Sequence, residues 1–523
     1  MKNFIAILIV TAMFFTCPTF AFAADTDVYA AYNEESKYEK LYDLEDAGEY
    51  KLFTNHVDGY SLYVDHDMTV DMSRADIVTV LENDTKRIEV YKQSLKGIYK
   101  AAYVNYSNGF LNNTISHKLY YNSEQTINGI DVHITSWERN KLDRVENDKN
   151  NYVSLDFEVD NYVYTIMIKS EIPIYLNGGY TYLIENFEVV AATQQPIIEM
   201  TSKVDVVNRG WNEETEEFYD WYFSDSAELS WGIFEPGVGY TGYDQLNMYE
   251  EYFNYEFPFV LNYSEVVNTS PDTIKNWLEG AYEKGKTVEL TLQTVPSSGN
   301  MVYNLLNGAY DKYLCEYARV IAEFGHPVLF RPFNEMNGDW CAYSSYNTSK
   351  DTMIYKEMYR YIYSIFESQG ANTNTVWVWN PNSVSFPNFD WNHSLMYYPG
   401  DEYVDIIGMT AYNTGTYYEG EKWQTFSELY DDVYADYLTW FGQPFMITEF
   451  SCSSVGGDKA AWMKDMFSKI YYLDRIKAAI WWDGCDYDSK GNIARSYFLD
   501  ETPEIMDVFR EGIKAPWDLN IYV

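Results

Sequence analysis

The sequence predicts two domains: an α/β (β/α)8 TIM barrel, preceded by a smaller α+β domain with an antiparallel sheet. Three observations lead to this prediction. The chain has 523 residues, which is too long for one ordinary domain. Residues 49–190 alternate apolar and polar side chains, as half-buried strands do. Beyond a boundary near residues 191–206, apolar runs alternate with helical stretches, which is typical of a parallel barrel.

The amino terminus has the pattern of a secretory signal. A short basic start, Met1-Lys2-Asn3, precedes the apolar run Phe4–Phe15 and the small-residue site Ala21-Phe22-Ala23-Ala24. We therefore assign residues 1–24 to a signal peptide and 25–48 to a polar leader. No later run reaches the roughly 18 apolar residues of a spanning helix. We expect a secreted, extracellular protein without a membrane span.

Residues 49–200 are predicted to form the N-terminal accessory domain. Two hairpin signals stand out, because turn-forming pairs separate alternating runs at Asp160-Asn161 and at Asn128-Gly129. Residues 98–112 have a helical pattern. The region carries no acid pair that would suggest chemistry. It is either a packing and spacer domain or a glycan-binding domain, and both interpretations stay open.

Residues 201–523 are predicted to form the barrel. The eight proposed strands are Trp231–Phe234, Pro258–Asn262, Thr287–Gln293, Val328–Phe333, Thr375–Trp379, Val404–Met409, Phe445–Ile447 and Ala478–Trp481. Helical stretches between them are 272–284, 303–324, 352–368, 424–440 and 458–472. In such a barrel the chemistry lies at the carboxyl ends of the strands.

Composition and charge restrict the partners. The formal net charge is −42 and the pI about 4.3, a field that repels nucleic acid, anionic lipid and acidic polysaccharide. Aromatic residues make up 18% of the chain, and their flat rings suit the apolar faces of sugars. We therefore expect a monomer that binds a neutral polysaccharide, without nucleic acid partners.

The sequence offers no support for a metal or another cofactor. Its histidines form no H-E-x-x-H pattern, and its cysteines form no C-x-x-C pair. After signal cleavage four cysteines remain, too few for a disulfide scaffold in so long a chain: Cys315, Cys341, Cys452 and Cys485. One disulfide or buried thiols near the strand ends are both compatible with their positions.

Two carboxylates follow predicted strands. Glu335 comes after the fourth strand and Glu449 after the seventh, so both side chains can converge over the barrel mouth. A pair of carboxyl groups, one protonated and one ionised, is what retaining cleavage of a glycosidic bond requires. Two unrelated surface glutamates are the alternative.

Residues 205–515 resemble glycoside hydrolase family 26, best known for endo-β-1,4-mannanases. The resemblance lies in Arg331-Pro-Phe-Asn-Glu-Met-Asn-Gly-Asp-Trp340, in Ile447-Thr-Glu-Phe450, and in a block from Tyr398 to Asn413. It implies that Glu335 is the acid/base, that Glu449 is the nucleophile, and that the anomeric configuration is retained. The chain departs from the family at Asn334, where mannanases usually carry His, and at Cys341-Ala342-Tyr343. Both departures bear on specificity for mannan.

Several neighbours are candidates for support of the two glutamates. Arg331 is expected to point into the mouth and keep Glu449 ionised, or else to form a structural ion pair. Tyr412 resembles the family tyrosine that hydrogen-bonds the nucleophile, and Asn334 is placed where an amide contacts the sugar. The predicted substrate-binding residues are Trp340, Trp481, Trp482 and Asn380. Of Trp481 and Trp482, at most one can face the mouth, because adjacent strand residues point to opposite sides.

The function predicted from the sequence is hydrolysis of a β-linked neutral polysaccharide by two glutamates. β-1,4-Mannan or glucomannan is the first choice of substrate, and mixed-linkage β-glucan or another β-glycan the second. A non-hydrolytic glycan-binding surface protein is an alternative of a different class, although binding alone requires neither carboxylate.

Overall fold

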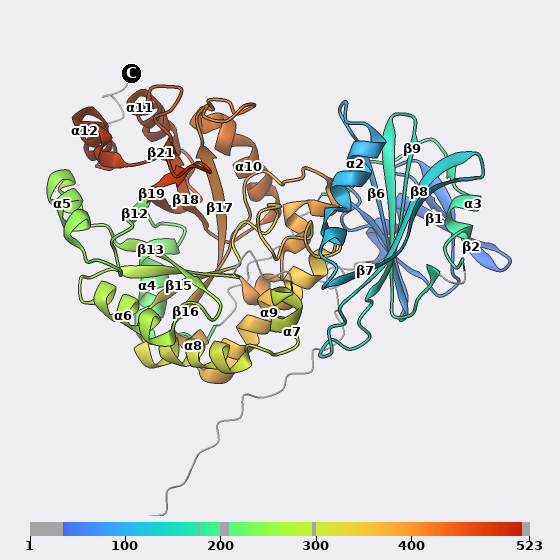
Figure 1. Cartoon of the computed structure of the whole chain (residues 1–523), viewed down its shortest axis with the longest axis horizontal. Coiled ribbons are helices and arrows are strands. Elements are labelled where there is room, and N and C mark those ends of the chain that lie inside the picture. The colour runs from blue at the N-terminus through green and yellow to red at the C-terminus, as the bar shows by residue number, and fades with distance from the viewer. Residues whose placement is uncertain (1–34, 176–177, 199–208, 295–299, 515–523) are drawn as a thin grey trace, which may run out of the picture.

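The computed structural model describes residues 35–175, 178–198, 209–294 and 300–514. The predicted signal peptide, the start of the predicted leader and the second half of the predicted domain boundary lie outside these residues. Figure 1 shows two domains side by side, with the barrel formed by the C-terminal part of the chain. Among the described residues, every helix is too short or too polar to cross a bilayer.

The N-terminal domain is a sandwich of two antiparallel sheets. One sheet has the order β1-β2-β3-β11 and the other β4-β5-β6-β10-β9-β8-β7. A buried apolar cluster that includes Phe53, Leu62, Ile134 and Ile166 forms its core. The strands are β1 (Tyr42–Ala47), β2 (Tyr50–Asn55), β3 (Tyr60–Val64), β4 (Thr69–Asp71), β5 (Thr79–Glu82), β6 (Lys86–Ser94), β7 (His117–Ile127), β8 (Ile130–Arg139), β9 (Asn151–Val159), β10 (Tyr162–Ser170) and β11 (Glu188–Val189).

Both predicted hairpins are confirmed. β9 and β10 meet at Asp160-Asn161, and β7 and β8 at Asn128-Gly129; all four turn residues have positive φ, as a two-residue hairpin turn of this kind requires. The helical prediction for 98–112 corresponds to α2 (Lys100–Ser107) and η3 (Gly109–Asn112). Short helices α1 (Glu35–Tyr38), η2 (Glu39–Leu41) and α3 (Tyr182–Glu185) complete the domain.

The predicted polar leader is wrong for residues 42–47. These residues form β1, whose partner along its whole length is β2. The strand alternates half-buried Tyr42 and Leu44 with exposed acidic residues, so it lies at a sheet edge with one face in water. Because Asp43, Glu45 and Asp46 make the segment strongly acidic, the alternation typical of a strand was not recognised in the sequence.

The C-terminal domain is a closed barrel of eight parallel strands, which confirms the predicted fold class. All eight predicted strands are present: β12 (Ser230–Phe234), β13 (Phe259–Glu265), β14 (Thr287–Gln293), β15 (Val328–Pro332), β16 (Thr375–Trp379), β17 (Ile406–Asn413), β18 (Phe445–Cys452) and β19 (Ile476–Trp482). The helices are α4 (Glu213–Phe223), α5 (Asp244–Phe253), α6 (Pro271–Tyr282), α7 (Met301–Leu306), α8 (Asp311–Phe324), α9 (Thr352–Gln369), α10 (Phe426–Trp440), α11 (Lys459–Ile470) and α12 (Pro503–Gly512). A small hairpin, β20 (Cys485–Tyr487) and β21 (Ile493–Ser496), follows the last strand.

The barrel interior changes from apolar to polar along the strands. Its apolar layers include Leu261, Leu329, Val378 and Ile480, and α4 contributes Phe223 to the same cluster. Toward the carboxyl ends, polar side chains such as Glu289, Thr291 and Arg331 take the inward positions. Polar residues inside a barrel must find partners there, because burial without partners is costly.

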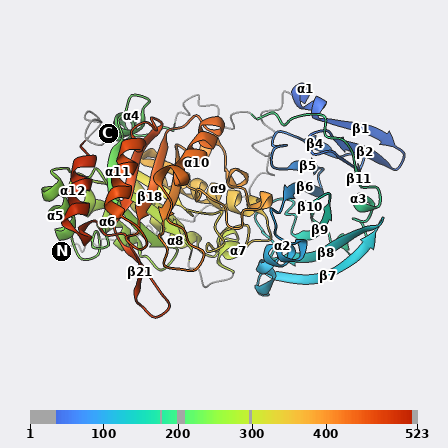
Figure 2. The same cartoon turned by 90° about the horizontal axis from the view of Figure 1, so that it is seen from above.

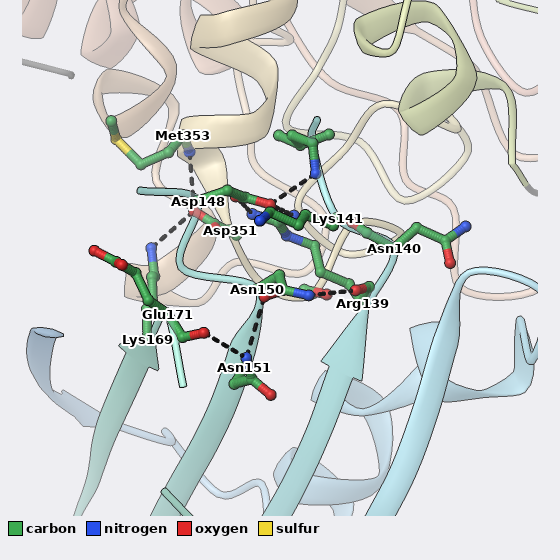
Figure 3. A network of polar contacts seen from close by, with 12 residues as sticks. Arg139, Asn140, Lys141, Asp148, Asn150, Asn151, Lys169, Glu171, Asp351 and Met353 are labelled. Carbon is green, nitrogen blue, oxygen red and sulfur yellow. Dashed lines mark hydrogen bonds and ion pairs between the residues drawn. The ribbon is translucent and has the colours of Figure 1, made fainter. Parts of the chain in front are cut away.

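Buried charges fix the N-terminal domain against the barrel. Asp351 of the barrel accepts hydrogen bonds from Lys169 (2.8 Å) and from the Tyr152 hydroxyl (2.6 Å), both in the N-terminal sheet. Asp351 also caps α9 by accepting from the Met353 amide, as Figure 3 shows. Lys169 in turn pairs with Glu89 at 2.7 Å. Since one acidic residue both starts a barrel helix and anchors the sheet, the two domains are joined at a structural element of the barrel.

Apolar contacts extend across the same interface. Tyr103 of α2 lies edge-on to Phe389 of the barrel, with ring centroids 4.5 Å apart, and Trp137 donates its indole N–H to Ser349. Tyr103, Trp137 and Phe389 belong to the same hydrophobic cluster as the side chains packed between the strands and helices of the barrel. The N-terminal domain therefore rests on the loops that follow β14, β15 and β16, at the carboxyl ends of the strands, and Figure 2 shows it beside the barrel from above.

Replacement of Lys169 by Met is expected to destabilise the protein by about 3–5 kcal/mol, because it removes the cation that lies between the two buried carboxylates of Asp351 and Glu89. Burial raises the pKa of Asp351, but Lys169 and Arg139 reverse this and lower it to about 2. A folded-state pKa below that of the unfolded chain stabilises the fold above about pH 4, and this contribution is lost as pH falls toward 2. Urea unfolding monitored at neutral pH measures the change.

The matched control is Lys275→Met. Lys275 pairs with Glu279 on the exposed face of α6 at 3.7 Å, and such pairs contribute about 0–1 kcal/mol. If Lys169→Met and Lys275→Met shift the unfolding midpoint equally, the buried network does not hold the interface.

Candidate active site

A β-bulge turns Glu449 toward the barrel mouth. In the pairing of β17 with β18, Met409 lies opposite Ile447 but Thr410 lies opposite Glu449, so Thr448 is an extra residue. Both Thr448 and Glu449 consequently face inward: the Thr448 hydroxyl lies 3.2 Å from that of Thr410, and Glu449 reaches Arg331. Bulges commonly re-aim a side chain in this way. Without it, alternation along β18 would direct Glu449 outward.

Arg331 lies fully buried beneath Glu449 and joins three strands. One terminal N–H donates to Glu449 at 2.9 Å, another donates to Asn380 at 3.1 Å, and Nε donates to Thr291 at 2.8 Å. Glu289 of β14 also lies 3.0 Å from Nε, as an ion pair without a well-aligned hydrogen bond. The guanidinium is thus held in one orientation, and its charge is directed at Glu449.

Burial raises the pKa of Glu289 to about 8, although Arg331 opposes the shift. Of the two carboxyls beside Arg331, Glu449 accepts a hydrogen bond from the guanidinium, whereas Glu289 does not.

Aromatic side chains also lie around Glu449 and Arg331. The Tyr263 hydroxyl, at the end of β13, donates to Glu449. Phe234 lies next to Tyr263 and stacks on Trp482, with ring centroids 5.1 Å apart and planes 13° apart. Tyr412 lies edge-on to Trp482 at 6.2 Å. A partly exposed indole stacked at the rim offers a face for a sugar ring.

Glu335 lies on a strained turn after β15. Its backbone and that of Phe333 have positive φ (53° and 55°), which costs on the order of 1–3 kcal/mol for each such residue. The Glu335 amide donates to the Asn380 carbonyl at 2.7 Å, and the Phe333 amide donates to the Leu292 carbonyl at 2.8 Å. Strands on both sides of β15 therefore hold the turn in place, as is typical of functional positions.

The Glu335 carboxyl has neutral hydrogen-bond donors. Asn382 donates to one oxygen at 2.6 Å and the Trp340 indole N–H to the other at 3.2 Å. Burial, followed by the charge of Glu449, raises the pKa of Glu335 to about 7 despite these donors. The two glutamates therefore interact electrostatically but differ in partners: Glu449 has a guanidinium and Glu335 has none within hydrogen-bonding distance.

The structure brings most of the predicted site residues together. Trp340, 47% exposed, lies on the loop after Glu335 beside Phe386. Asn334 is almost completely buried, and its side-chain oxygen accepts from Gln293 at 2.8 Å. Trp482 lies at the mouth and Trp481 does not, as expected for adjacent residues of one strand.

Two predicted substrate-binding residues need correction. Asn380 is fully buried; its side chain supports Arg331, and its carbonyl supports Glu335. Trp481 is also fully buried and packs behind the barrel against Phe509. Neither side chain is accessible to a ligand, so both are supporting residues.

Three residues near the carboxylates were missed from the sequence: Tyr263, Glu289 and Asn382. Tyr263 lies just beyond the predicted end of its strand. Glu289 could have been found from the sequence, because polar residues occupy every second position of its strand: Thr287, Glu289, Thr291 and Gln293. Its placement would have required assigning this polar face to the barrel interior. Asn382, on the loop after β16, has no recognisable signal.

Comparison with known proteins agrees with this geometry. Residues 260–439 match the model for glycosyl hydrolase family 26, a range that includes Glu335 and ends before Glu449. This part of the barrel is therefore similar to glycosyl hydrolase family 26. The chain is 30% identical over 259 residues to Endoglucanase H of Acetivibrio thermocellus, covering 48% of this chain and 27% of that protein. It is 34% identical over 137 residues to a mannan endo-1,4-β-mannosidase of Bacillus subtilis, covering 25% of this chain and 33% of that protein.

The chain thus spans about a quarter to a third of the length of these two curated relatives. A modular endo-β-1,4-mannanase from Cellulomonas fimi is similar in structure, with 17% identity and a TM-score of 0.45 over 60% of this chain and 77% of that one.

The pKa of Glu335 is expected to depend on Glu449. In the wild type the carboxyl should titrate near 7; in Glu449→Gln its pKa should fall but stay above the ordinary 4.5, because burial remains when the neighbouring charge is removed. Carbon-13 NMR of labelled glutamate carboxyls, with Glu335→Gln to assign the signal, measures both values. An unchanged pKa in Glu449→Gln would contradict the predicted coupling.

Proposed function

We propose that this protein is a secreted, retaining glycoside hydrolase that cleaves a β-linked neutral polysaccharide through Glu335 and Glu449. The single observation that carries the proposal is the contrast between the two carboxyls over one barrel mouth. Glu449 is ion-paired with Arg331, whereas the pKa of Glu335 is raised to about 7. Two carboxyls in different protonation states are the minimum that double displacement requires.

In the first step, protonated Glu335 donates its proton to the departing glycosidic oxygen while Glu449 attacks the anomeric carbon. The product of this step is a glycosyl ester on Glu449 and a free sugar hydroxyl. In the second step, ionised Glu335 takes a proton from water, which attacks the same carbon and releases Glu449. Two displacements at one carbon restore its original configuration.

The supporting residues have separate tasks. Arg331 and Tyr263 orient Glu449 by donating to it, so that the carboxylate is preorganised for attack. Asn382 and Trp340 orient Glu335. Trp482, at the rim, offers a stacking face to the sugar next to Glu449. Tyr412 contributes its ring to the same aromatic wall.

β-1,4-Mannan or glucomannan is the first choice of substrate. The family 26 region and the matched mannan endo-1,4-β-mannosidases support it. A net charge of −42 favours a neutral polymer over an acidic one.

β-Glucan is a second candidate for a specific reason. The match to Endoglucanase H extends over 48% of this chain, compared with 25% for the Bacillus subtilis mannosidase. In addition, Asn334 replaces the histidine usual in family mannanases. Reducing-sugar release from mannan, glucomannan and mixed-linkage β-glucan distinguishes the two candidates, and no release from any of them favours a glycan-binding protein without activity.

On the polymer that is cleaved, kcat/KM should fall as pH rises through about 7, because Glu335 then loses the proton that it must donate. Glu449→Ala should lower kcat/KM by at least roughly a thousandfold at any pH, since it removes the attacking group. Initial rates across pH 4–9 measure both effects.

Glu188→Ala is the control, because Glu188 is exposed in β11 of the N-terminal domain. Its rates should match the wild type. The proposal is refuted if Glu449→Ala remains folded by circular dichroism and hydrolyses the polymer at the wild-type rate.

A further inference from the structure

We propose that the N-terminal domain forms part of the substrate cleft, as a subsite for sugar units on the leaving-group side of the cleaved bond. This inference rests on the proposed function and extends it. Its basis is a pocket between the domains, here called the interdomain pocket. Gly109, Asn112 and Asn113 line it from the N-terminal domain, and Asp339, Trp340 and Asn347 line it from the barrel.

The interdomain pocket is large enough for a sugar. Its volume is about 480 Å³, within the range of small-molecule sites. The residues that line it carry amides, a carboxylate and an indole. Hydrogen-bonding groups around a flat aromatic ring suit a neutral hexose, which offers hydroxyls at its edge and C–H groups on its faces.

Trp340 connects the interdomain pocket to Glu335. Its indole N–H donates to the Glu335 carboxyl, and the same residue lines the pocket. Glu335 would protonate the departing oxygen, so sugars that extend past Trp340 belong to the leaving group. Trp482 lies on β19, four strands from β15 in the closed barrel, and lines a separate pocket. A chain bound across both carboxyls would therefore reach the N-terminal domain at its leaving-group end.

Direct contacts hold the N-terminal lining in place. The Tyr106 hydroxyl of α2 donates to Asp339, the residue before Trp340, and the Tyr106 ring lies 5.1 Å from that of Tyr346. Gly109 is in close contact with Tyr346, because a Cβ at this position would lie 2.4 Å from the tyrosine oxygen. A rigid wall loses little entropy when a ligand binds, which favours a real subsite over an incidental gap.

A further pair of contacts fixes the other side of this wall. The Ser116 hydroxyl and the Asn140 amide both donate to the Asn300 side chain, at 3.0 and 2.6 Å. Asn300 directly precedes α7, whose Met301 also lines the interdomain pocket. The N-terminal domain is thus joined to the barrel on both sides of the pocket.

Asn112→Trp tests the inference in the full-length protein. Asn112 is exposed at the rim of the interdomain pocket, so a tryptophan can fill the pocket without disturbing the core. Substrates are β-1,4-manno-oligosaccharides of two to six units and the polymer, or the β-glucan series if that polymer is cleaved. The ratio of kcat/KM on the polymer to kcat/KM on the shortest cleaved oligosaccharide should fall about tenfold, equivalent to ~1.4 kcal/mol of lost binding.

Glu188→Trp is the control: it adds the same ring on β11, in the four-stranded sheet of the N-terminal domain. It should leave the ratio of kcat/KM on the polymer to kcat/KM on the oligosaccharide unchanged. Asn112→Ala should lower the ratio less than Asn112→Trp. An unchanged ratio in Asn112→Trp, with hydrolysis intact, overturns the subsite alone. If the wild type hydrolyses none of these glycans, the proposed function fails. Binding of the six-unit oligosaccharides, measured by calorimetry, then tests the subsite by itself. Equal affinity in the wild type and in Asn112→Trp overturns the subsite as well.

Discussion

The candidate site depends on one buried guanidinium. Arg331 has no exposed surface, and an unpaired charge in that position would be strongly destabilising. Glu289 and Glu449 both lie within ion-pair distance of it, but burial raises the pKa of Glu289 to about 8. Only Glu449 of the two also accepts a hydrogen bond from the guanidinium. The stability of the polar layer and the orientation of Glu449 are consequences of the same interaction.

The second glutamate differs because its surroundings differ. Glu335 lies on a strained turn whose amides bond to neighbouring strands, and its carboxyl meets only neutral donors. Two residues of the same type thus have different surroundings: Arg331 pairs with Glu449, while burial raises the pKa of Glu335. The N-terminal domain packs against the loop that carries Trp340, so the accessory domain and the candidate site share one set of contacts. This arrangement favours an accessory domain that acts at the cleft over a simple spacer.

The sequence predicted the barrel well because its strands are short apolar runs that recur between amphipathic helices. It also predicted both hairpins, since turn residues with positive φ leave a clear signal at Asn128-Gly129 and Asp160-Asn161. The sequence was misleading where a strand carries polar side chains at positions that are usually apolar. β14 places Glu289 inside, and acidic β1 was taken for a leader. Asn380 and Trp481 have the residue types of sugar contacts, but only packing in three dimensions shows that they are buried. The bulge at Thr448, which turns Glu449 inward, is not visible in a pattern of period two.

Covalent trapping would identify the attacking carboxylate. The full-length protein would be incubated with a 2-deoxy-2-fluoro glycosyl fluoride of the matching sugar, which slows release of the glycosyl-enzyme. We expect a mass increase of one fluoroglycosyl group, located by peptide mapping on Glu449 and absent from Glu449→Ala. Labelling of another carboxylate, or rapid turnover of the reagent without any adduct, would contradict this expectation.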